Sequence, residues 1–410
     1  MSKPALSLPQ GSRGFISALG VAQICSWGSL YYSFPQIAQA VGDEFGWTKS
    51  ELYGAVTLGL LLSSFATFPV GVAIDRGYGR YVMAAASLLA GLLLFAWSQI
   101  DTLFGFYAIF AAIGCLQAAT LYEPAFAVIV RRFGPGQARD GITALTLWGG
   151  FASTVFIPII ELLLSELGWR GALMMLGGVN VLVCAAIYAS VIRPERDAVE
   201  HVETKPSLIG AFRNPSVGRA MRLPVFWSLM LCYFCYALLF SSFTFHMYPL
   251  FIEKGLSAVD AVTVIACIGP SQVAGRVFIT FVARNASIPA IGSAALGLMA
   301  LVFIAAYGAP LNFIFMAAIG IGYGATNGIV TIVRGMSIPS LVSKTDYGSI
   351  NGVLIGPYML AIAIGPMAAA WLHETGGGYD TVQIAFIALS SIVALAFWTA
   401  VAVRPAEFRT

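Results

Sequence analysis

Long runs of apolar residues, separated by short polar breaks, extend over most of the 410-residue chain. A helix of about 20 apolar residues, rising 1.5 Å per residue, is long enough to cross the ~30 Å hydrocarbon core of a membrane. Charged or turn-forming residues bound twelve such runs. We therefore predict twelve transmembrane helices, over residues 14–38, 51–74, 81–100, 103–130, 141–165, 170–192, 223–252, 258–283, 288–309, 311–333, 346–373 and 379–403.

The composition supports an all-α integral membrane protein. Hydrophobic residues make up 59% of the chain and charged residues only 10%, whereas soluble proteins carry about 25% charged residues. The cysteines lie within the apolar runs, which indicates small buried side chains and no disulfide framework. Cys232 and Cys235 form a Cys-x-x-Cys pair without a second pair, so we expect no metal site and no cofactor.

The longest polar break, 193–222, divides the chain into two halves. We predict an N-terminal six-helix bundle over 1–192, a cytoplasmic loop over 193–222 and a C-terminal six-helix bundle over 223–410. The polar N-terminal stretch lacks the short apolar core and small-residue cleavage site of a signal peptide, so we interpret it as a cytoplasmic tail.

Helix-start signals recur in the two halves at a nearly constant offset. Thr48 precedes Glu51 by three residues at the second apolar run, and Ser257 precedes Asp260 in the same way at the eighth. This spacing is typical of a capping box at a helix N-terminus. The recurrence indicates a parallel duplication of a six-helix unit.

The distribution of basic residues predicts the orientation. If the N-terminus is cytoplasmic, only Lys49, Arg170 and Lys254 of the 22 lysines and arginines lie outside, and Arg276 lies within a helix. Positive charges gather on the cytoplasmic side of membrane proteins. We therefore expect both termini in the cytoplasm.

Arg276 lies deep in the predicted helix 258–283. It precedes Arg284 by eight residues, roughly 12 Å along a helix. An arginine at the centre of a membrane helix costs about 2.5–3.5 kcal/mol on insertion scales, and it does not lose its proton. Arg276 must therefore face a partner acid, a water-filled cavity or an anionic substrate.

The loop after the second run contains Gly71, Asp75, Arg76, Gly79 and Arg80. Their spacing resembles the signature of the major facilitator superfamily at this place. The resemblance implies two pseudo-symmetric six-helix bundles, and it implies a gating role for these five residues.

Three further motifs resemble bacterial relatives of monocarboxylate transporters and oxalate/formate antiporters. They are Phe-Gly-Trp-Thr at 45–48, Gly-Trp-Arg at 168–170, and the pair Gln272 and Arg276. In monocarboxylate transporters an acid stands four residues before an arginine that binds the substrate carboxylate. The resemblance implies that Arg276 has this role, with Gln272 at the position of the acid.

Aromatic residues occur in the helices that line the central cavity in this superfamily. A tyrosine hydroxyl can donate a hydrogen bond to a carboxylate while its ring packs against a carbon chain. Each residue alone fits ordinary packing, but we expect several to reach the substrate. The candidates are Trp27, Tyr31, Tyr32, Tyr122, Trp148, Tyr323 and Tyr358.

Glu123 and His246 are candidates for coupling transport to protons. Burial in a membrane helix raises the pKa of a carboxyl group toward neutrality, which would suit Glu123. The alternative for Glu123 is a structural ion pair with Arg80 or Arg276. For His246 the alternative is an ordinary hydrogen-bonded side chain.

Together these features predict a transporter of a small organic anion, a monocarboxylate, which works by alternating access with a proton or counter-anion as coupling partner. We expect a monomer in the bacterial inner membrane, surrounded by lipid, with no nucleic-acid partner. An exporter of drug-like or cationic amphiphiles using Glu123, and a transporter-like membrane sensor, are the alternatives. The sequence shows no Ser/His/Asp set, metal-ligand cluster or phosphate loop that would indicate an enzyme.

The charge pattern also suggests the charge of the substrate. Arg276 is the one basic residue placed deep in a predicted helix, and 351–371 contains no lysine or arginine. A second carboxylate would then lack a fixed counter-charge, so monoanions are expected to bind better than dianions. Arg334, placed at the end of the run 311–333, would alter this expectation if it reached the site.

Overall fold

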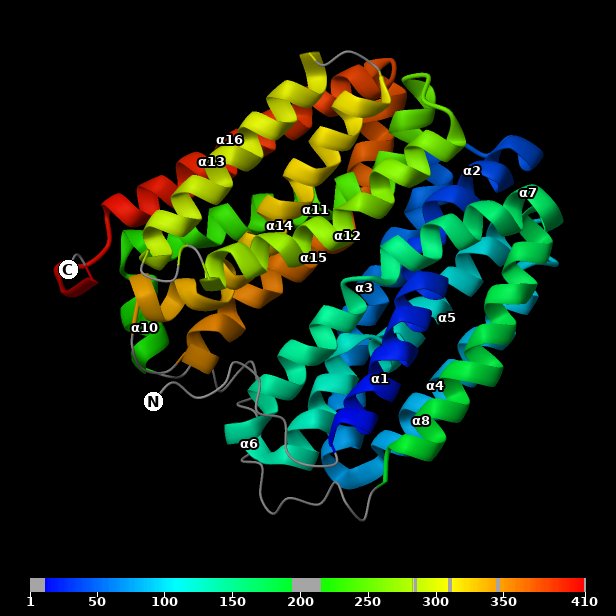
Figure 1. Ribbon diagram of the computed structural model, residues 1–410, viewed down its shortest axis with the longest axis horizontal. Coiled ribbons are helices and arrows are strands. Elements are labelled where there is room, and N and C mark those ends of the chain that lie inside the picture. Colours follow the sequence, from blue (N-terminus) through cyan, green and yellow to red (C-terminus); the bar gives the residue numbers. More distant parts are fainter. Residues whose placement is uncertain are drawn as a thin grey trace. The chain divides into compact units, whose positions relative to one another are not determined.

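The computed structural model describes residues 12–193, 215–281, 283, 286–308, 312–343 and 347–408. All regular structure in these residues is helical (Figure 1). Residue contacts divide the chain into two compact units, Met1–Glu203 (unit 1) and Thr204–Thr410 (unit 2).

The described residues of unit 1 form eight α-helices and π-helical turns that join some of them. These elements are α1 (Ser12–Trp27), η1 (Gly28–Tyr32), α2 (Phe34–Phe45), α3 (Lys49–Ala73), η2 (Ile74–Tyr78), α4 (Gly79–Trp97), α5 (Leu103–Thr120), α6 (Tyr122–Gly149), α7 (Ala152–Val179), η3 (Asn180–Cys184) and α8 (Ala185–Val191).

In the described part of unit 2 there are six long helices and two short ones. They are α10 (Pro215–Met221), α11 (Pro224–Glu253), α12 (Ala258–Phe281), α13 (Ile288–Gly308), α14 (Phe313–Leu341), α15 (Tyr347–Gly376), α16 (Tyr379–Ala402) and η4 (Ala406–Phe408). The predicted loop 193–222 lies largely outside the described residues. Its last part forms α10, which the apolar pattern missed because the helix is short.

Nine helical stretches of the described residues are long and apolar enough to cross a membrane. Two of them, Lys49–Trp97 and Gly141–Val191, have 49 and 51 residues, more than twice the length that one crossing needs. Gly77 (φ +91°) and Gly168 (φ +67°) interrupt these stretches with a backbone conformation that favours glycine. The count of twelve crossings and the cytoplasmic termini stay predictions.

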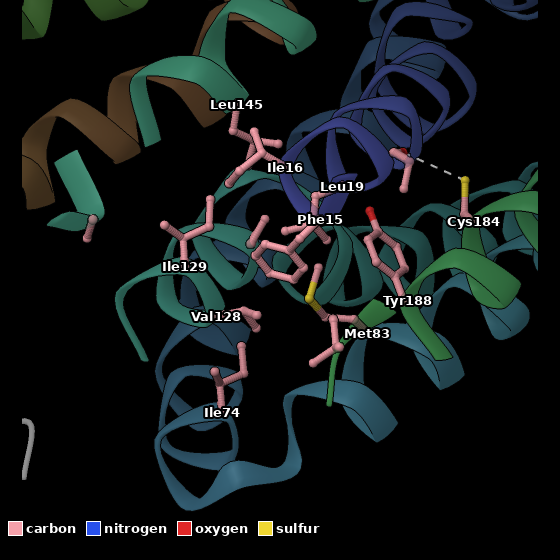
Figure 2. Close-up of a cluster of buried hydrophobic side chains, with 14 residues drawn as sticks. Phe15, Ile16, Leu19, Ile74, Met83, Val128, Ile129, Leu145, Cys184 and Tyr188 are labelled. Carbon is pink, nitrogen blue, oxygen red and sulfur yellow. Dashed lines mark hydrogen bonds between the residues drawn. The ribbon is translucent and has the colours of Figure 1, made fainter. Parts of the chain in front are cut away.

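An apolar core holds the helices of unit 1 together. Figure 2 shows Phe15 and Leu19 of α1 among Met83 of α4, Val128 of α6 and Tyr188 of α8. Tyr188 and Leu19 have no exposed surface. This core fixes α1 against three helices from distant parts of unit 1.

Glycines allow one pair of helices in each unit to cross at very short range. A Cβ atom added at Gly59 or Gly114, where α3 meets α5, would lie 2.6 or 2.0 Å from a backbone oxygen of the neighbouring helix. At Gly324 and Gly328, where α14 meets α12, the distances would be 2.6 and 2.2 Å. Small residues let membrane helices approach closely. The crossing helices correspond to the second and fourth apolar runs of each half.

The two predicted helix caps are present but differ in detail. The Thr48 hydroxyl accepts from the Glu51 N–H at 3.2 Å, and the Glu51 carboxylate accepts from the Thr48 N–H at 2.8 Å. Ser257 accepts from the Asp260 N–H at 3.1 Å, but its hydroxyl donates to the Asp260 carboxylate at 2.8 Å. Aspartate is one methylene shorter than glutamate, so its carboxylate meets the hydroxyl and not the backbone.

Candidate functional site

The close crossing of α12 and α14 positions Arg276. A Cβ atom at the preceding Gly275 would lie 2.4 Å from the Ala325 carbonyl oxygen, so the two backbones are nearly in contact. The Arg276 Nε donates to the Gly328 carbonyl oxygen over 3.4 Å. The half-buried guanidinium therefore lies on the surface of α14.

A second arginine of unit 2, Arg334, lies on α14, as does the Gly328 carbonyl that Arg276 contacts. The Arg334 guanidinium lies 4.2 Å from the centroid of the Tyr358 ring. Buried Tyr236 donates a hydrogen bond to the side-chain oxygen of Asn327, the residue before Gly328. We call Arg276, Arg334, Tyr236, Asn327 and Tyr358 the arginine cluster.

The arginine cluster contains predicted residues and residues that the sequence analysis missed. Arg276 and Tyr358 were both predicted, whereas Tyr236 and Asn327 were not. An asparagine inside an apolar run is a signal that could have identified Asn327. Arg334 was placed at the end of a helix, but α14 continues to Leu341 and so Arg334 lies within it.

Gln272 and Tyr323, which were also predicted as substrate-binding residues, are not part of the arginine cluster. Gln272 is half-buried, and its backbone oxygen lies where a Cβ atom at Gly328 would clash. The Tyr323 ring packs edge-on against Phe243 at 4.6 Å and Phe303 at 5.8 Å between centroids. Tyr323 therefore contributes to the packing of α14 against α11 and α13.

Most of the predicted aromatic residues of unit 1 lie around Trp27. Its ring centroid is 5.1 Å from that of Tyr31, 4.9 Å from that of Tyr122 and 6.2 Å from that of Tyr32. Trp148 lies along α1, where its ring occupies the space that a Cβ atom at Gly20 would need, and it is 37% exposed.

The predicted helix 103–130 is wrong in one respect, because it breaks at Leu121 (φ −83°, ψ −153°). The helical partner of the Thr120 carbonyl would be residue 124, but this is a proline and has no N–H. This carbonyl accepts instead from the Gln23 amide at 2.8 Å and from the Tyr188 hydroxyl at 3.2 Å. Two side chains from distant parts of unit 1 thus stabilise the break.

Glu123 lies directly after this break, in the first turn of α6. The Glu123 side chain is exposed. The helix N-terminus carries a partial positive charge that stabilises a carboxylate. Among the described residues of unit 1, no cation, Arg80 included, forms an ion pair with Glu123. Broken helices in transporters present their ends to substrates and ions.

His246 is completely buried and uses both ring nitrogens. Its Nε2 lies 2.8 Å from the Pro366 carbonyl oxygen, and its Nδ1 lies 2.8 Å from the Tyr379 hydroxyl. A carbonyl oxygen only accepts, so Nε2 carries a proton. This arrangement favours the hydrogen-bonded interpretation over a proton carrier.

The predicted gating loop is anchored within unit 1. Arg131 of α6 donates to the Asp75 main-chain carbonyl. Gly79 is buried, and a Cβ atom there would lie 3.1 Å from Val128. The neighbouring members of the motif differ in exposure: Gly71 and Arg80 are half-buried, and Asp75 and Arg76 are exposed. Among all the described residues of the chain, no group of three or more His, Cys, Asp or Glu side chains could hold a metal ion.

The motifs at 45–48 and 168–170 meet in unit 1. Glu44 accepts hydrogen bonds from Trp169 Nε1 at 2.6 Å and from Arg170 at 2.7 Å. The Arg170 guanidinium also lies 4.2 Å from the centroid of the Trp169 ring. The hydrogen bond from Trp169, and next that from Arg170, lower the pKa of the Glu44 carboxyl.

Glu44 lies beyond the predicted span 14–38, and we expect it to make stability depend on pH. A carboxyl whose pKa is lower in the folded protein stabilises the fold at pH values above its unfolded pKa, about 4.3. This contribution disappears as the pH falls through the folded pKa. Thermal unfolding between pH 3 and 7 should show a smaller loss at low pH in Glu44→Gln than in the parent. The matched control is Glu166→Gln, also exposed. An equal change in both variants would contradict this assignment.

Comparison with known proteins identifies the family. The family model of the Major Facilitator Superfamily matches residues 19–334, and the chain belongs to this family. It is therefore a multi-pass integral membrane protein of a transporter family, as the gating motif predicted.

The curated relatives are similar at low identity. Monocarboxylate transporter 12-B of Danio rerio is 22% identical, over 89% of this chain and 75% of the relative. Monocarboxylate transporter 11 of Homo sapiens is 28% identical over 45% of this chain, and the match spans 40% of that relative's length. The human match thus covers less than half of either protein.

Solved structures show the same fold. A bacterial homologue of the human lysosomal transporter Spinster superposes with a TM-score of 0.74 at 14% identity, over 97% of this chain and 98% of that one. The nucleoside transporter NupG superposes with a TM-score of 0.71 at 15% identity, over 95% and 99%. At these identities the likeness concerns the fold alone.

Proposed function

We propose that the protein transports a small organic anion by alternating access and that Arg276 binds the carboxylate of this anion. The observation that carries the proposal is the arginine cluster. It places half-buried Arg276 against the Gly328 carbonyl of α14, next to Asn327, which accepts a hydrogen bond from buried Tyr236. The planar guanidinium fork matches a carboxylate through two parallel hydrogen bonds.

The printed names of the relatives support monocarboxylates as the first substrate class to test. The gating loop at Asp75 would control access from the cytoplasm. The bacterial inner membrane and the monomeric state stay predictions.

Glu123 is proposed to couple transport to protons. Its carboxylate lies at the end of a broken helix, where a change of protonation alters the charge next to Tyr122. We expect Glu123→Gln to exchange substrate at the parent rate but to lose acceleration by an inward proton gradient. Uptake into proteoliposomes with and without a pH gradient measures this. A variant that responds to the gradient as the parent does would contradict the coupling role.

An exporter of cationic amphiphiles is a second candidate. The exposed carboxylate of Glu123, the residue after Tyr122 in the first turn of α6, favours it, because carboxylates attract cations.

A thermal-shift screen of the purified protein distinguishes the two candidates. A specific ligand stabilises the folded state by RT ln(1 + [L]/Kd), about 2.7 kcal/mol at a hundredfold excess over Kd. We expect small carboxylates to raise the unfolding temperature and amphiphilic cations to leave it unchanged. Stabilisation by the cations alone would contradict the proposed function.

A further inference from the structure

A cavity of about 100 Å³ lies within unit 2, at the end where α11 and α13 finish and where α14 and α16 begin. All four helices contribute to its walls. None of the residues that line it belongs to the arginine cluster. The cavity is therefore distinct from the site proposed for the transported anion.

Aromatic side chains close the inner part of the cavity. The Phe243 ring centroid is 4.6 Å from that of Tyr323 and 5.8 Å from that of Phe386, and Phe303 lies 5.8 Å from Phe386. Each of the four side chains is at most 6% exposed. Aromatic rings attract a further ring edge-on or offset at such distances, so this wall suits an aromatic ligand.

The cavity opens beside Lys254 and Tyr307. Lys254 directly follows the last residue of α11, and Tyr307, near the end of α13, is 47% exposed. Among the described residues that line the cavity, Lys254 alone is charged, and it forms an ion pair with Asp380. Because this ion pair already compensates the lysine, the cavity favours a neutral ligand.

Gln383 places one amide group in this apolar wall. It is 8% exposed, and its side-chain oxygen accepts no hydrogen bond from any described residue. Buried polar groups are paired in the great majority of cases, so an unpaired one requires an explanation. An amide offers both a donor and an acceptor, and a hydroxyl group can pair with either.

The size of the cavity limits the ligand. Its volume is several times the ~10–15 Å³ that one water molecule needs, and it is smaller than an apolar cavity of ~150 Å³ that binds benzene. A single aromatic ring can still enter, because part of it can extend toward the opening beside Tyr307. Larger ring systems do not match this volume.

We propose that this cavity is a binding site for a neutral compound with one aromatic ring and one hydroxyl group, a phenol. The ring lies against Phe243, Phe303 and Phe386, and the hydroxyl pairs with the Gln383 amide. The inference goes beyond the proposed function and does not depend on it.

Two fluorinated probes of matched size test the site. 4-Fluorophenol carries the hydroxyl and fluorobenzene lacks it, and a phenol keeps its proton at pH 7, because its pKa is about 10. Fluorine NMR measures both dissociation constants on the purified full-length protein, with protein-free micelles as the reference for partition into detergent. We expect saturable binding of 4-fluorophenol by the parent protein.

Gln383→Leu tests recognition of the hydroxyl. The ratio of the two dissociation constants should shift at least tenfold toward fluorobenzene in this variant, because the leucine leaves the ligand hydroxyl unpaired. Its unfolding temperature without ligand should be no lower than that of the parent, because an unpaired buried amide has been removed. This second measurement separates loss of recognition from misfolding.

A matched pair of variants on α13 tests the position of the site. Ala306 lines the cavity and is half-buried, whereas the adjacent Ala305 is exposed and does not line it. Ala306→Leu fills part of the cavity and should weaken binding of both probes at least tenfold. Ala305→Leu should change either dissociation constant less than twofold.

Three outcomes would overturn the inference. They are a lack of saturable binding of 4-fluorophenol by the parent, an unchanged ratio in Gln383→Leu, and equal effects of the two α13 variants. An unchanged ratio would mean that water alone satisfies the amide. None of these results would affect carboxylate binding at Arg276, so the proposed function is tested separately.

Discussion

Replacement of Arg276 by alanine is expected to weaken substrate binding about 30-fold to 4,000-fold without preventing insertion or folding. Truncating one member of a buried, hydrogen-bonded charge pair costs about 2–5 kcal/mol, and each 1.4 kcal/mol corresponds to a factor of ten. Insertion should not suffer, because the change removes a charge that is costly within a membrane.

Arg276→Lys should bind with intermediate affinity, because a lysine keeps the charge but loses the planar pair of donors. The measurement is the dissociation constant for the carboxylate found in the thermal-shift screen. Arg219→Ala is the matched control, because Arg219 is exposed on the short helix α10. Equal affinities in Arg276→Ala and the parent would contradict the assigned role.

Replacement of Gly328 by valine should damage both the fold of unit 2 and substrate binding. A Cβ atom at this position would lie 2.2 Å from the Gln272 backbone oxygen. Since a backbone atom cannot rotate away, α12 and α14 must separate, at a cost of about 1–3 kcal/mol or more. Their separation also removes the Gly328 carbonyl from Arg276.

Gly335→Val is the matched control on the same helix. A Cβ atom at Gly335 would meet nothing within 4 Å, so this variant carries only the helix-propensity difference. Unfolding temperature and carboxylate affinity of the two variants should differ clearly. If both variants behaved alike, the close crossing would not be what positions Arg276.

The helical runs could be predicted from the sequence because a membrane segment must be apolar along its whole length. Start signals such as Thr48 and Glu51 refined the boundaries. The break at Leu121 has a local signal in Pro124, which lacks the N–H that the Thr120 carbonyl would need. Gln23 and Tyr188, which donate to this carbonyl instead, could not be predicted, because they are far from the break in the sequence and become neighbours only in the folded unit.

The candidate site was predicted only in part. Arg276 could be found because a charge deep in an apolar run is conspicuous. Tyr236 and Asn327 were missed, since their association depends on the packing of α11 against α14. Arg334 was assigned to a helix end because a charge normally bounds an apolar run, but α14 continues to Leu341.

Counterflow of a radiolabelled carboxylate in proteoliposomes tests the account most directly. Vesicles loaded with the same unlabelled carboxylate should accumulate label transiently in the presence of the parent protein, and Arg276→Ala should abolish this accumulation. Absence of counterflow by a parent protein that binds the same carboxylate would contradict transport and would favour the membrane sensor.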